Sequence, residues 1–211
     1  MKIVTINGSP RNSGNTAYTL DVASTVFKNE GIETERIDIG VRAIRGCAGC
    51  RLCRQRLDRR CIANDDIVNS YLETLFTADG LLVSSPVYYA GINGALKSFL
   101  DRAFFVASAN GALFRHKVGA GMVAVRRAGA TTALEQINKY LAISEMFVPT
   151  SSYWGMAYGM APGESAQDVE GVQTAQVLAA NMAWLLKALD AARKIIPPPA
   201  AQAKIMMNFI R

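Results

Sequence analysis

Four cysteines lie within a short stretch of the chain and form its most distinctive set of reactive side chains. They are Cys47, Cys50, Cys53 and Cys61. The C-x2-C-x2-C-x7-C spacing suits a [4Fe–4S] cluster, because three ligands come from one tight turn and the fourth lies nearby. A zinc site with four thiolates more often pairs two C-x2-C units. Free thiols in an ordinary loop are the third interpretation, and the sequence leaves the three open.

Arginines alternate with these cysteines, at positions 51, 54, 56, 59 and 60. Such cations would partly neutralise a group of thiolates and raise the reduction potential of a bound cluster. The simpler interpretation is that they keep an exposed loop solvated. A third is that they form a docking surface for an acidic protein partner.

A second candidate site follows the apolar run at residues 3–6. The loop at residues 8–16 is made of small and hydroxylated residues and contains one arginine. A loop of this kind, followed by a helix N-terminus, suits a phosphate group. Its glycines, Gly8 and Gly14, fit neither the Walker pattern nor the G-x-G-x-x-G pattern. The alternative is an ordinary turn capped by Ser13 or Asn15.

A third candidate site is the segment at residues 84–95, which follows another apolar run. It contains Pro86, Val87, Tyr88 and Tyr89 together with small residues. Aromatic rings and accessible backbone N–H groups suit a flat aromatic ligand. Packing of both tyrosines into the core is the alternative.

Alternating strands and helices must position these loops. We expect strands at residues 2–6, 33–37, 80–85, 118–125 and 147–151, with helices of apolar periodicity between them and after the last. This alternation predicts a parallel sheet that is covered on both faces, with ligands at the carboxyl ends of its strands. Longer connections are expected at residues 41–64, 108–117 and 153–168.

Composition excludes several classes of protein. The formal charge of +6 permits anionic ligands, but no basic stripe with interleaved aromatics indicates nucleic acid. No apolar run approaches the roughly 18 residues of a membrane span, and the first strand leaves no room for a signal peptide. We therefore expect a cytoplasmic protein with reduced cysteines. A hydrolase would depend on the single histidine, His116, without an evident nucleophile. Asp65 and Asp66 are expected to cap a helix.

Three of these motifs together resemble a known family. They are residues 8–11 with Asn15 and Thr16, residues 85–88, and residues 96–102. The chain resembles the flavodoxin-like NAD(P)H-dependent FMN reductases over roughly residues 1–190, in the branch that includes the iron–sulfur flavoproteins. The resemblance implies FMN, with its phosphate held by Ser9, Arg11, Ser13, Asn15 and Thr16. Its isoalloxazine would lie against Pro86, Val87, Tyr88 and Tyr89. A third loop near the flavin would contribute Arg126 and Gly129.

The predicted fold is therefore a five-stranded doubly wound α/β domain of strand order 2-1-3-4-5, at residues 1–190. Residues 41–64 form a cysteine-rich insertion, and residues 191–211 a Pro-rich tail whose apolar end is expected to pack on this subunit or a partner. The expected function is oxidation of NAD(P)H through FMN by a quinone, flavin, nitro or azo acceptor, without an acid–base side chain. The alternative is an electron carrier with FMN and [4Fe–4S] that accepts electrons from a ferredoxin-like protein. A homodimer or homotetramer is expected.

Overall fold

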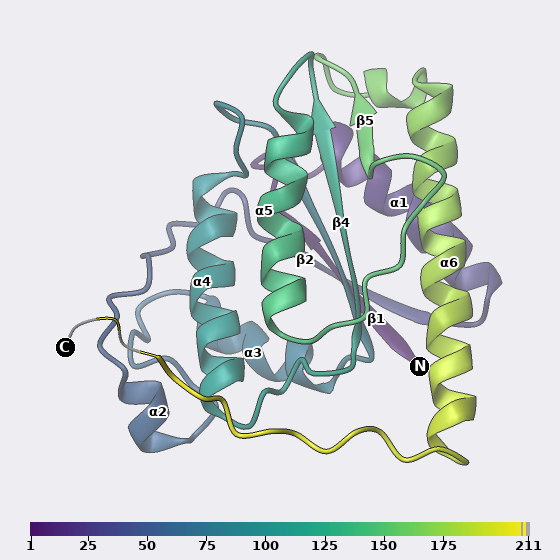
Figure 1. The fold of residues 1–211 in the computed structure, drawn as a ribbon. Coiled ribbons are helices and arrows are strands. Elements are labelled where there is room, and N and C mark those ends of the chain that lie inside the picture. The colour runs from purple at the N-terminus through teal and green to yellow at the C-terminus, as the bar shows by residue number, and fades with distance from the viewer. Residues whose placement is uncertain (208, 210–211) are drawn as a thin grey trace.

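The computed structural model describes residues 1–207 and 209, and its centre is a five-stranded parallel sheet (Figure 1). The strand order is β2-β1-β3-β4-β5, which confirms the predicted topology. Each strand pairs in parallel with its neighbours. The strands are β1 (Lys2–Asn7), β2 (Glu33–Asp38), β3 (Gly80–Pro86), β4 (Val118–Val125) and β5 (Met156–Tyr158).

Helices cover both faces of the sheet, as a buried parallel sheet requires (Figure 1). One face carries α1 (Asn15–Asn29) and α6 (Val169–Arg193), and the other carries α3 (Val68–Thr77), α4 (Gly94–Ala109) and α5 (Ala130–Ile143). Two short helices lie in connections: α2 (Leu52–Arg56) and η1 (Glu164–Ala166). The sequence analysis did not predict α2, which lies among the cysteines.

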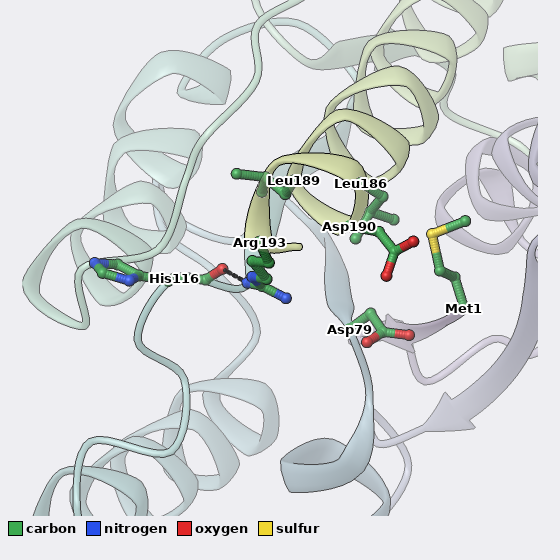
Figure 2. Close-up of a pocket in the computed structure, with 7 residues that line it drawn as sticks. All are labelled: Met1, Asp79, His116, Leu186, Leu189, Asp190 and Arg193. Atoms are coloured by element: carbon green, nitrogen blue, oxygen red, sulfur yellow. Dashed lines mark hydrogen bonds between the residues drawn. The ribbon is translucent and has the colours of Figure 1, made fainter. Parts of the chain in front are cut away.

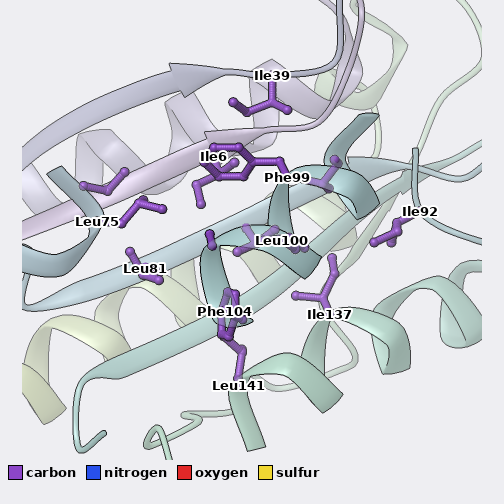
Figure 3. Close-up of a cluster of buried hydrophobic side chains, with 14 of the residues drawn as sticks. Ile6, Ile39, Leu75, Leu81, Ile92, Phe99, Leu100, Phe104, Ile137 and Leu141 are labelled. Atoms are coloured by element: carbon purple, nitrogen blue, oxygen red, sulfur yellow. The ribbon is translucent and has the colours of Figure 1, made fainter. Parts of the chain in front are cut away.

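Alternate residues of the strands supply two separate cores. Ile3 and Leu82 pack with α1 and α6, whereas Val4 and Leu81 pack with α3, α4 and α5. The larger core includes an apolar stripe of α4, among whose residues Phe99, Leu100 and Phe104 face the strands and α5 (Figure 3). Burial of such side chains contributes about 1.5–3 kcal/mol each, so this stripe fixes α4 firmly on the sheet.

The predicted fifth strand at residues 147–151 is wrong. Phe147 makes one parallel bridge to Val118, at the start of β4, and the chain then leaves the sheet at Val148. Pro149 lacks an N–H group and therefore cannot continue the ladder. The chain returns to the same edge of β4 with β5, inside the segment that the sequence analysis assigned to a loop.

The C-terminal tail leaves α6 at Arg193 and runs across the lower side of the molecule in Figure 1. The Arg115 guanidinium donates to the carbonyl of Pro199, at 3.1 Å. Ile205, Met206, Met207 and Phe209 are all exposed, so the expected packing on this subunit is not present at these positions. The rest of the predicted apolar end lies outside the described residues.

Across the part of the chain that the structure describes, we find no helix with both the length and the apolar character that crossing a bilayer requires.

Candidate functional site

Three of the predicted site loops meet at one edge of the sheet. They follow β1, β3 and β4, and the carboxyl ends of parallel strands lie on the same side. The Gly8 N–H donates to the carbonyl of Ser84 at 2.8 Å, which joins the first loop to the end of β3. A β carbon added at Gly129 would lie 2.7 Å from the Cα of Ala90, so the second and third loops touch.

The first loop is held in shape by a buried asparagine at the end of β1. The Asn7 side chain donates to Asp38 at 2.8 Å and accepts from the N–H of Ser9 at 3.0 Å. The Ser9 hydroxyl in turn accepts from the N–H of Arg11 at 3.1 Å. Arg11 and Ser13 remain exposed at the surface. The loop is therefore formed before any ligand binds, with its cation facing outward.

A second tether reaches this loop from β2. The Arg36 guanidinium donates to the carbonyl of Asn12 at 3.0 Å, and it also pairs with Asp21 at 2.9 Å and with Asp38 at 3.3 Å. The sequence analysis missed Asn7, Arg36 and Asp38, because their pairing depends on the neighbouring positions of β1 and β2. The charged residues of β2 were the only feature of the sequence that could have indicated these contacts.

Asn15, a predicted phosphate ligand, contacts a fourth loop. Its side-chain amide donates to the carbonyl of Ala161 at 3.0 Å and accepts from the N–H of Ser165 at 3.2 Å. A β carbon at Gly159 would lie 2.7 Å from the same amide nitrogen, so this contact needs glycine there. One amide hydrogen of Asn15 is therefore already used in this contact. Donation to a phosphate by its second amide hydrogen stays a prediction. Thr16 is buried in the first turn of α1.

The second loop contains a strained two-residue turn. Tyr88 and Gly91 exchange two backbone hydrogen bonds of 2.9 Å, around Tyr89 at φ +48° and Ala90 at φ +58°. These are type I′ features, and each non-glycine residue in this region costs roughly 1–2 kcal/mol. Tyr88 is 46% exposed and Tyr89 fully exposed, so the core-packing alternative for these tyrosines is wrong. Pro86 and Val87 are half-buried beside them.

The third loop follows β4 directly. Arg126 is exposed at the end of the strand, and Gly129, the N-cap residue of α5, has φ +87°. The first N–H groups of a helix have no partner within the helix, so this start adds donors to the same edge. The structure therefore brings the three predicted loops together, without testing which of their residues bind a ligand.

All four cysteines line a single cavity of about 230 Å³. They are free thiols, of which Cys47 and Cys50 are exposed, Cys53 is buried and Cys61 is half-buried. Arg102 and Phe105 of α4 also line this cavity. Within residues 1–207 and 209, no three Cys, His, Asp or Glu side chains form a group that could hold a metal ion. Ligation by the four thiols therefore stays a prediction.

The thiols are close enough to influence one another electrostatically. Burial raises the pKa of Cys53, and the negative charge of Cys50 raises it further, with Cys61 and Cys47 acting in the same direction. A cationic iron–sulfur core would reverse this effect, because metal binding favours thiolates. The shared cavity and its four free thiols are the donor set that a multi-thiolate cluster requires.

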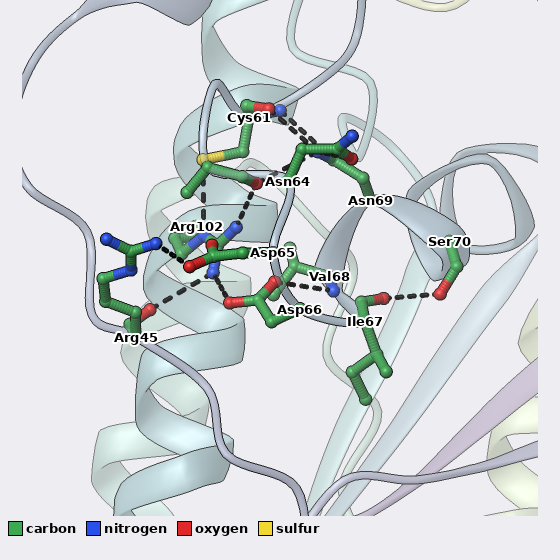
Figure 4. Close-up of polar contacts among 11 residues, drawn as sticks. Arg45, Cys61, Asn64, Asp65, Asp66, Ile67, Val68, Asn69, Ser70 and Arg102 are labelled. Carbon is green, nitrogen blue, oxygen red and sulfur yellow. Dashed lines mark hydrogen bonds and ion pairs between the residues drawn. The ribbon is translucent and has the colours of Figure 1, made fainter.

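A buried arginine connects the cysteine segment to α4 (Figure 4). Arg102 is 1% exposed, and its Nε–H donates to the sulfur of Cys61 at 3.3 Å. It also donates to the carbonyls of Arg45, at 3.3 Å, and Ala63, at 2.8 Å, and pairs with Asp66. The sequence analysis gave Arg102 no such role. The available signal was helical spacing, which places it on the same face as Phe99 and Val106.

The prediction that Asp65 and Asp66 cap a helix is partly confirmed. Asp66 accepts from the N–H of Val68, the first residue of α3, at 3.1 Å, while Asp65 pairs with Arg45. The cap residue itself is Ile67, so the predicted capping is displaced by one position.

Lys97 and Asp101 form an ion pair across one turn of α4, at 2.7 Å. The Tyr140 hydroxyl also donates to Asp101. Burial, followed by this hydrogen bond, raises the pKa of Tyr140 to about 12. These contacts join α4 to α5 and lie outside the candidate site.

The single histidine lies at the opposite end of the sheet (Figure 2). His116 precedes β4, and its carbonyl accepts from Arg193 at 2.6 Å beside a cavity of about 20 Å³, room for about one water. Its ring stacks on Phe147, with 5.2 Å between centroids. Burial and then the charge of Arg115 lower the pKa of His116. Its position excludes it from chemistry at the loops described above.

Sheet order and loop positions define a flavodoxin-like protein with its candidate ligand site at the β1–β3 switch point. The structure superposes on a WrbA-like flavodoxin of Agrobacterium tumefaciens with a TM-score of 0.56, at 15% identity, covering 89% of this chain and 97% of that one.

The family follows from the sequence comparison. The model of the NADPH-dependent FMN reductase family matches residues 1–161, and the chain belongs to this family of flavoproteins. It is 36% identical over 195 residues to an iron-sulfur flavoprotein of Methanocaldococcus jannaschii, covering 89% of this chain and 98% of the relative. It is 30% identical to an iron-sulfur flavoprotein of Methanosarcina thermophila, covering 90% and 97%. The resemblance found in the sequence is thereby confirmed.

Proposed function

We propose that this protein is an electron carrier that holds FMN at the carboxyl edge of the sheet and a [4Fe–4S] cluster in the cysteine cavity. The main observation in support of this proposal is that all four cysteines of the C-x2-C-x2-C-x7-C motif line one cavity. The relatives named above, both iron-sulfur flavoproteins, support this function better than the nicotinamide-dependent reductase expected first. When bound, the cluster would supply one-electron transfer and FMN one- or two-electron transfer.

At the flavin site, the residues of this chain would bind FMN and orient it. Arg11 and Ser13 are exposed on a loop that Asn7 already holds in shape, so they are suited to a phosphate group. Tyr88 lies on the strained turn that contacts Gly129, and its exposed ring could pack against a flat ligand. The ligand roles of Ser9, Asn15, Thr16, Pro86, Val87, Tyr89 and Arg126 belong to the same proposal.

We propose a ferredoxin-like acidic protein as the electron donor. The cysteine segment at residues 41–64 contains seven arginines and one aspartate, so its formal charge of +6 equals that of the whole chain. All seven arginines are exposed, and Arg45 and Arg51 line the cysteine cavity itself. Concentrated positive charge at a site of electron transfer speeds encounter with an acidic partner and makes the rate fall with ionic strength.

Iron and acid-labile sulfide analysis after anaerobic purification tests the cluster. Four irons per chain are expected, and Cys53→Ser should abolish them while FMN content stays unchanged. Iron-free protein with four titratable thiols, even after anaerobic reconstitution, would refute the carrier function.

Stopped-flow reduction tests the electron donor. Reduced ferredoxin should bleach the flavin faster than NADH or NADPH does, and the rate should drop as salt is added. Arg51→Gln with Arg54→Gln should slow it, whereas Lys139→Gln, an exposed change on α5, should not. Rapid bleaching by NAD(P)H and none by ferredoxin would instead support the reductase, which the family name favours. The substrate of that reductase would be a quinone, flavin, nitro or azo compound.

We also propose that the protein assembles as a homodimer or homotetramer. The exposed apolar residues of the tail, at positions 205–207 and 209, offer a surface that a second subunit could cover. Light scattering of the full chain and of a chain ending at residue 200 tests this. A monomer in both cases would contradict it.

A further inference from the structure

We propose that Arg102 is a positioning residue for Cys61, and that its Nε–H hydrogen bond to the Cys61 sulfur raises the reduction potential of the cluster. The effect on the potential rests on the proposed function. The positioning of the thiol is a property of the chain itself and can be tested without a cluster.

The geometry of Arg102 goes beyond what burial of an ion pair requires. Asp66, whose side chain is 6% exposed, already neutralises the guanidinium. The remaining N–H groups reach the Cys61 sulfur at 3.3 Å and the carbonyls of Arg45 and Ala63 (Figure 4). Arg45 lies just before the first cysteine and Ala63 just after the last. One rigid guanidinium fork on α4 thus joins both ends of the cysteine segment.

The backbone of Cys61 is also held by two hydrogen bonds. Its N–H donates to the side chain of Asn69 at 2.8 Å, and its carbonyl accepts from the same side chain at 2.8 Å. Asn69 is itself buried in the first turn of α3. Cys47 and Cys50, in contrast, lie on exposed loop. Cys61 therefore has both its backbone and its sulfur oriented before any metal binds.

A hydrogen bond to a thiolate ligand has a known electronic consequence. It withdraws electron density from the sulfur and stabilises the reduced, more negative state of a cluster, which raises the potential. The Arg102 charge acts in the same direction. Loss of the hydrogen bond alone should lower the potential less than loss of both the bond and the charge.

The test compares three variants with the natural chain, all purified anaerobically with FMN content and far-UV circular dichroism as controls for folding. Arg102→Lys keeps the charge but removes the Nε–H donor, and Arg102→Gln removes both. Arg60→Gln removes a charge next to Cys61, from a side chain that makes no hydrogen bond or ion pair with the described residues. Redox titration should give a more negative cluster potential for both Arg102 variants, and more so for Arg102→Gln. Arg60→Gln should change it less than Arg102→Lys does.

Arg102→Gln leaves Asp66 buried without its partner, so that variant could fail to fold. The double variant Arg102→Gln with Asp66→Asn contains no unpaired buried charge, and its new amide oxygen can still accept from Val68. It should fold and show a lowered potential, but less so than Arg102→Gln alone, because the negative charge of Asp66 is lost together with the Arg102 charge. A natural-like potential in folded Arg102→Lys and in the double variant would overturn the effect on the cluster.

Thiol alkylation separates this inference from the proposed function. In metal-free, FMN-loaded protein, mass spectrometry should show a several-fold change in the rate at which iodoacetamide alkylates Cys61 in the Arg102 variants, with Cys47 as internal reference. An unchanged ratio would overturn the positioning role. Absence of iron from the natural chain would refute the proposed function only, and the alkylation ratio would still decide the role of Arg102.

Discussion

Replacement of Gly129 by alanine tests whether contact between the second and third loops shapes the candidate flavin site. Gly129 has φ +87° and ψ 3°, a region that costs an L residue with a β carbon about 1–2 kcal/mol. The added β carbon would also stand 2.7 Å from the Cα of Ala90, a backbone atom that cannot rotate away. Overpacking of this kind costs about 1–3 kcal/mol. We therefore expect Gly129→Ala to lower the free energy of unfolding by about 2–5 kcal/mol.

Gly163 provides a matched control. Its φ of +89° and ψ of −12° are nearly the same, but a β carbon there would meet no atom within 4 Å. Gly163→Ala should lower the free energy of unfolding only by the cost of the left-handed backbone conformation, about 1–2 kcal/mol. Urea unfolding of the FMN-free proteins measures both changes. Fluorescence titration should show weaker FMN binding for Gly129→Ala, because the turn that holds Tyr88 must move, and unchanged binding for Gly163→Ala. Equal losses of stability in the two variants would refute the steric argument.

Three further predictions concern single contacts. Arg11→Ala should weaken FMN binding by about 2–3 kcal/mol, the worth of one or two charge-assisted hydrogen bonds, and unchanged affinity in a fluorescence titration would exclude Arg11 as a phosphate ligand. The pKa of Tyr140 is raised in the folded protein to about 12, so its contribution to stability is complete below pH 10 and is lost as pH rises toward 12. Urea unfolding between pH 9 and 11 should therefore show a steeper decline for the natural chain than for Tyr140→Phe, and parallel curves would contradict this. Arg102→Gln should lower the free energy of unfolding by about 3–5 kcal/mol, because Asp66 then stays buried without its partner. Adding Asp66→Asn should restore much of that loss in the same urea experiment.

The sequence predicts the sheet well where strands are buried on both faces. The strands β1, β3 and β4 contain the apolar runs from which they were predicted, and each lies within one residue of its predicted bounds, as does the more exposed β2. The fifth strand was misplaced because β5 has only three residues, and its place is set by pairing with Val123 to Val125 rather than by its own pattern. Short edge strands of this kind carry little local signal.

In the candidate site, too, local motifs could be predicted from the sequence, whereas contacts set by the tertiary fold could not. Motifs on single loops, such as the cysteines and the residues after β1, could be found from spacing alone. The residues that hold these loops come from distant parts of the chain: Asp38 holds the first loop through Asn7, and Arg102 holds the cysteine segment through Cys61. Their partners are set by the tertiary fold, so the sequence could mark Arg102 only as a charged residue on an apolar helix face.

The charge of the cysteine segment has a consequence for handling the protein. Because residues 41–64 contain the entire formal charge of +6, the acidic and basic residues elsewhere in the chain balance one another. A variant with these arginines neutralised would approach its isoelectric point at neutral pH, where proteins self-associate and precipitate. We therefore expect the charge of this segment to favour solubility as well. Experiments that remove several of its arginines need compensating charges elsewhere, or aggregation will be mistaken for loss of partner binding.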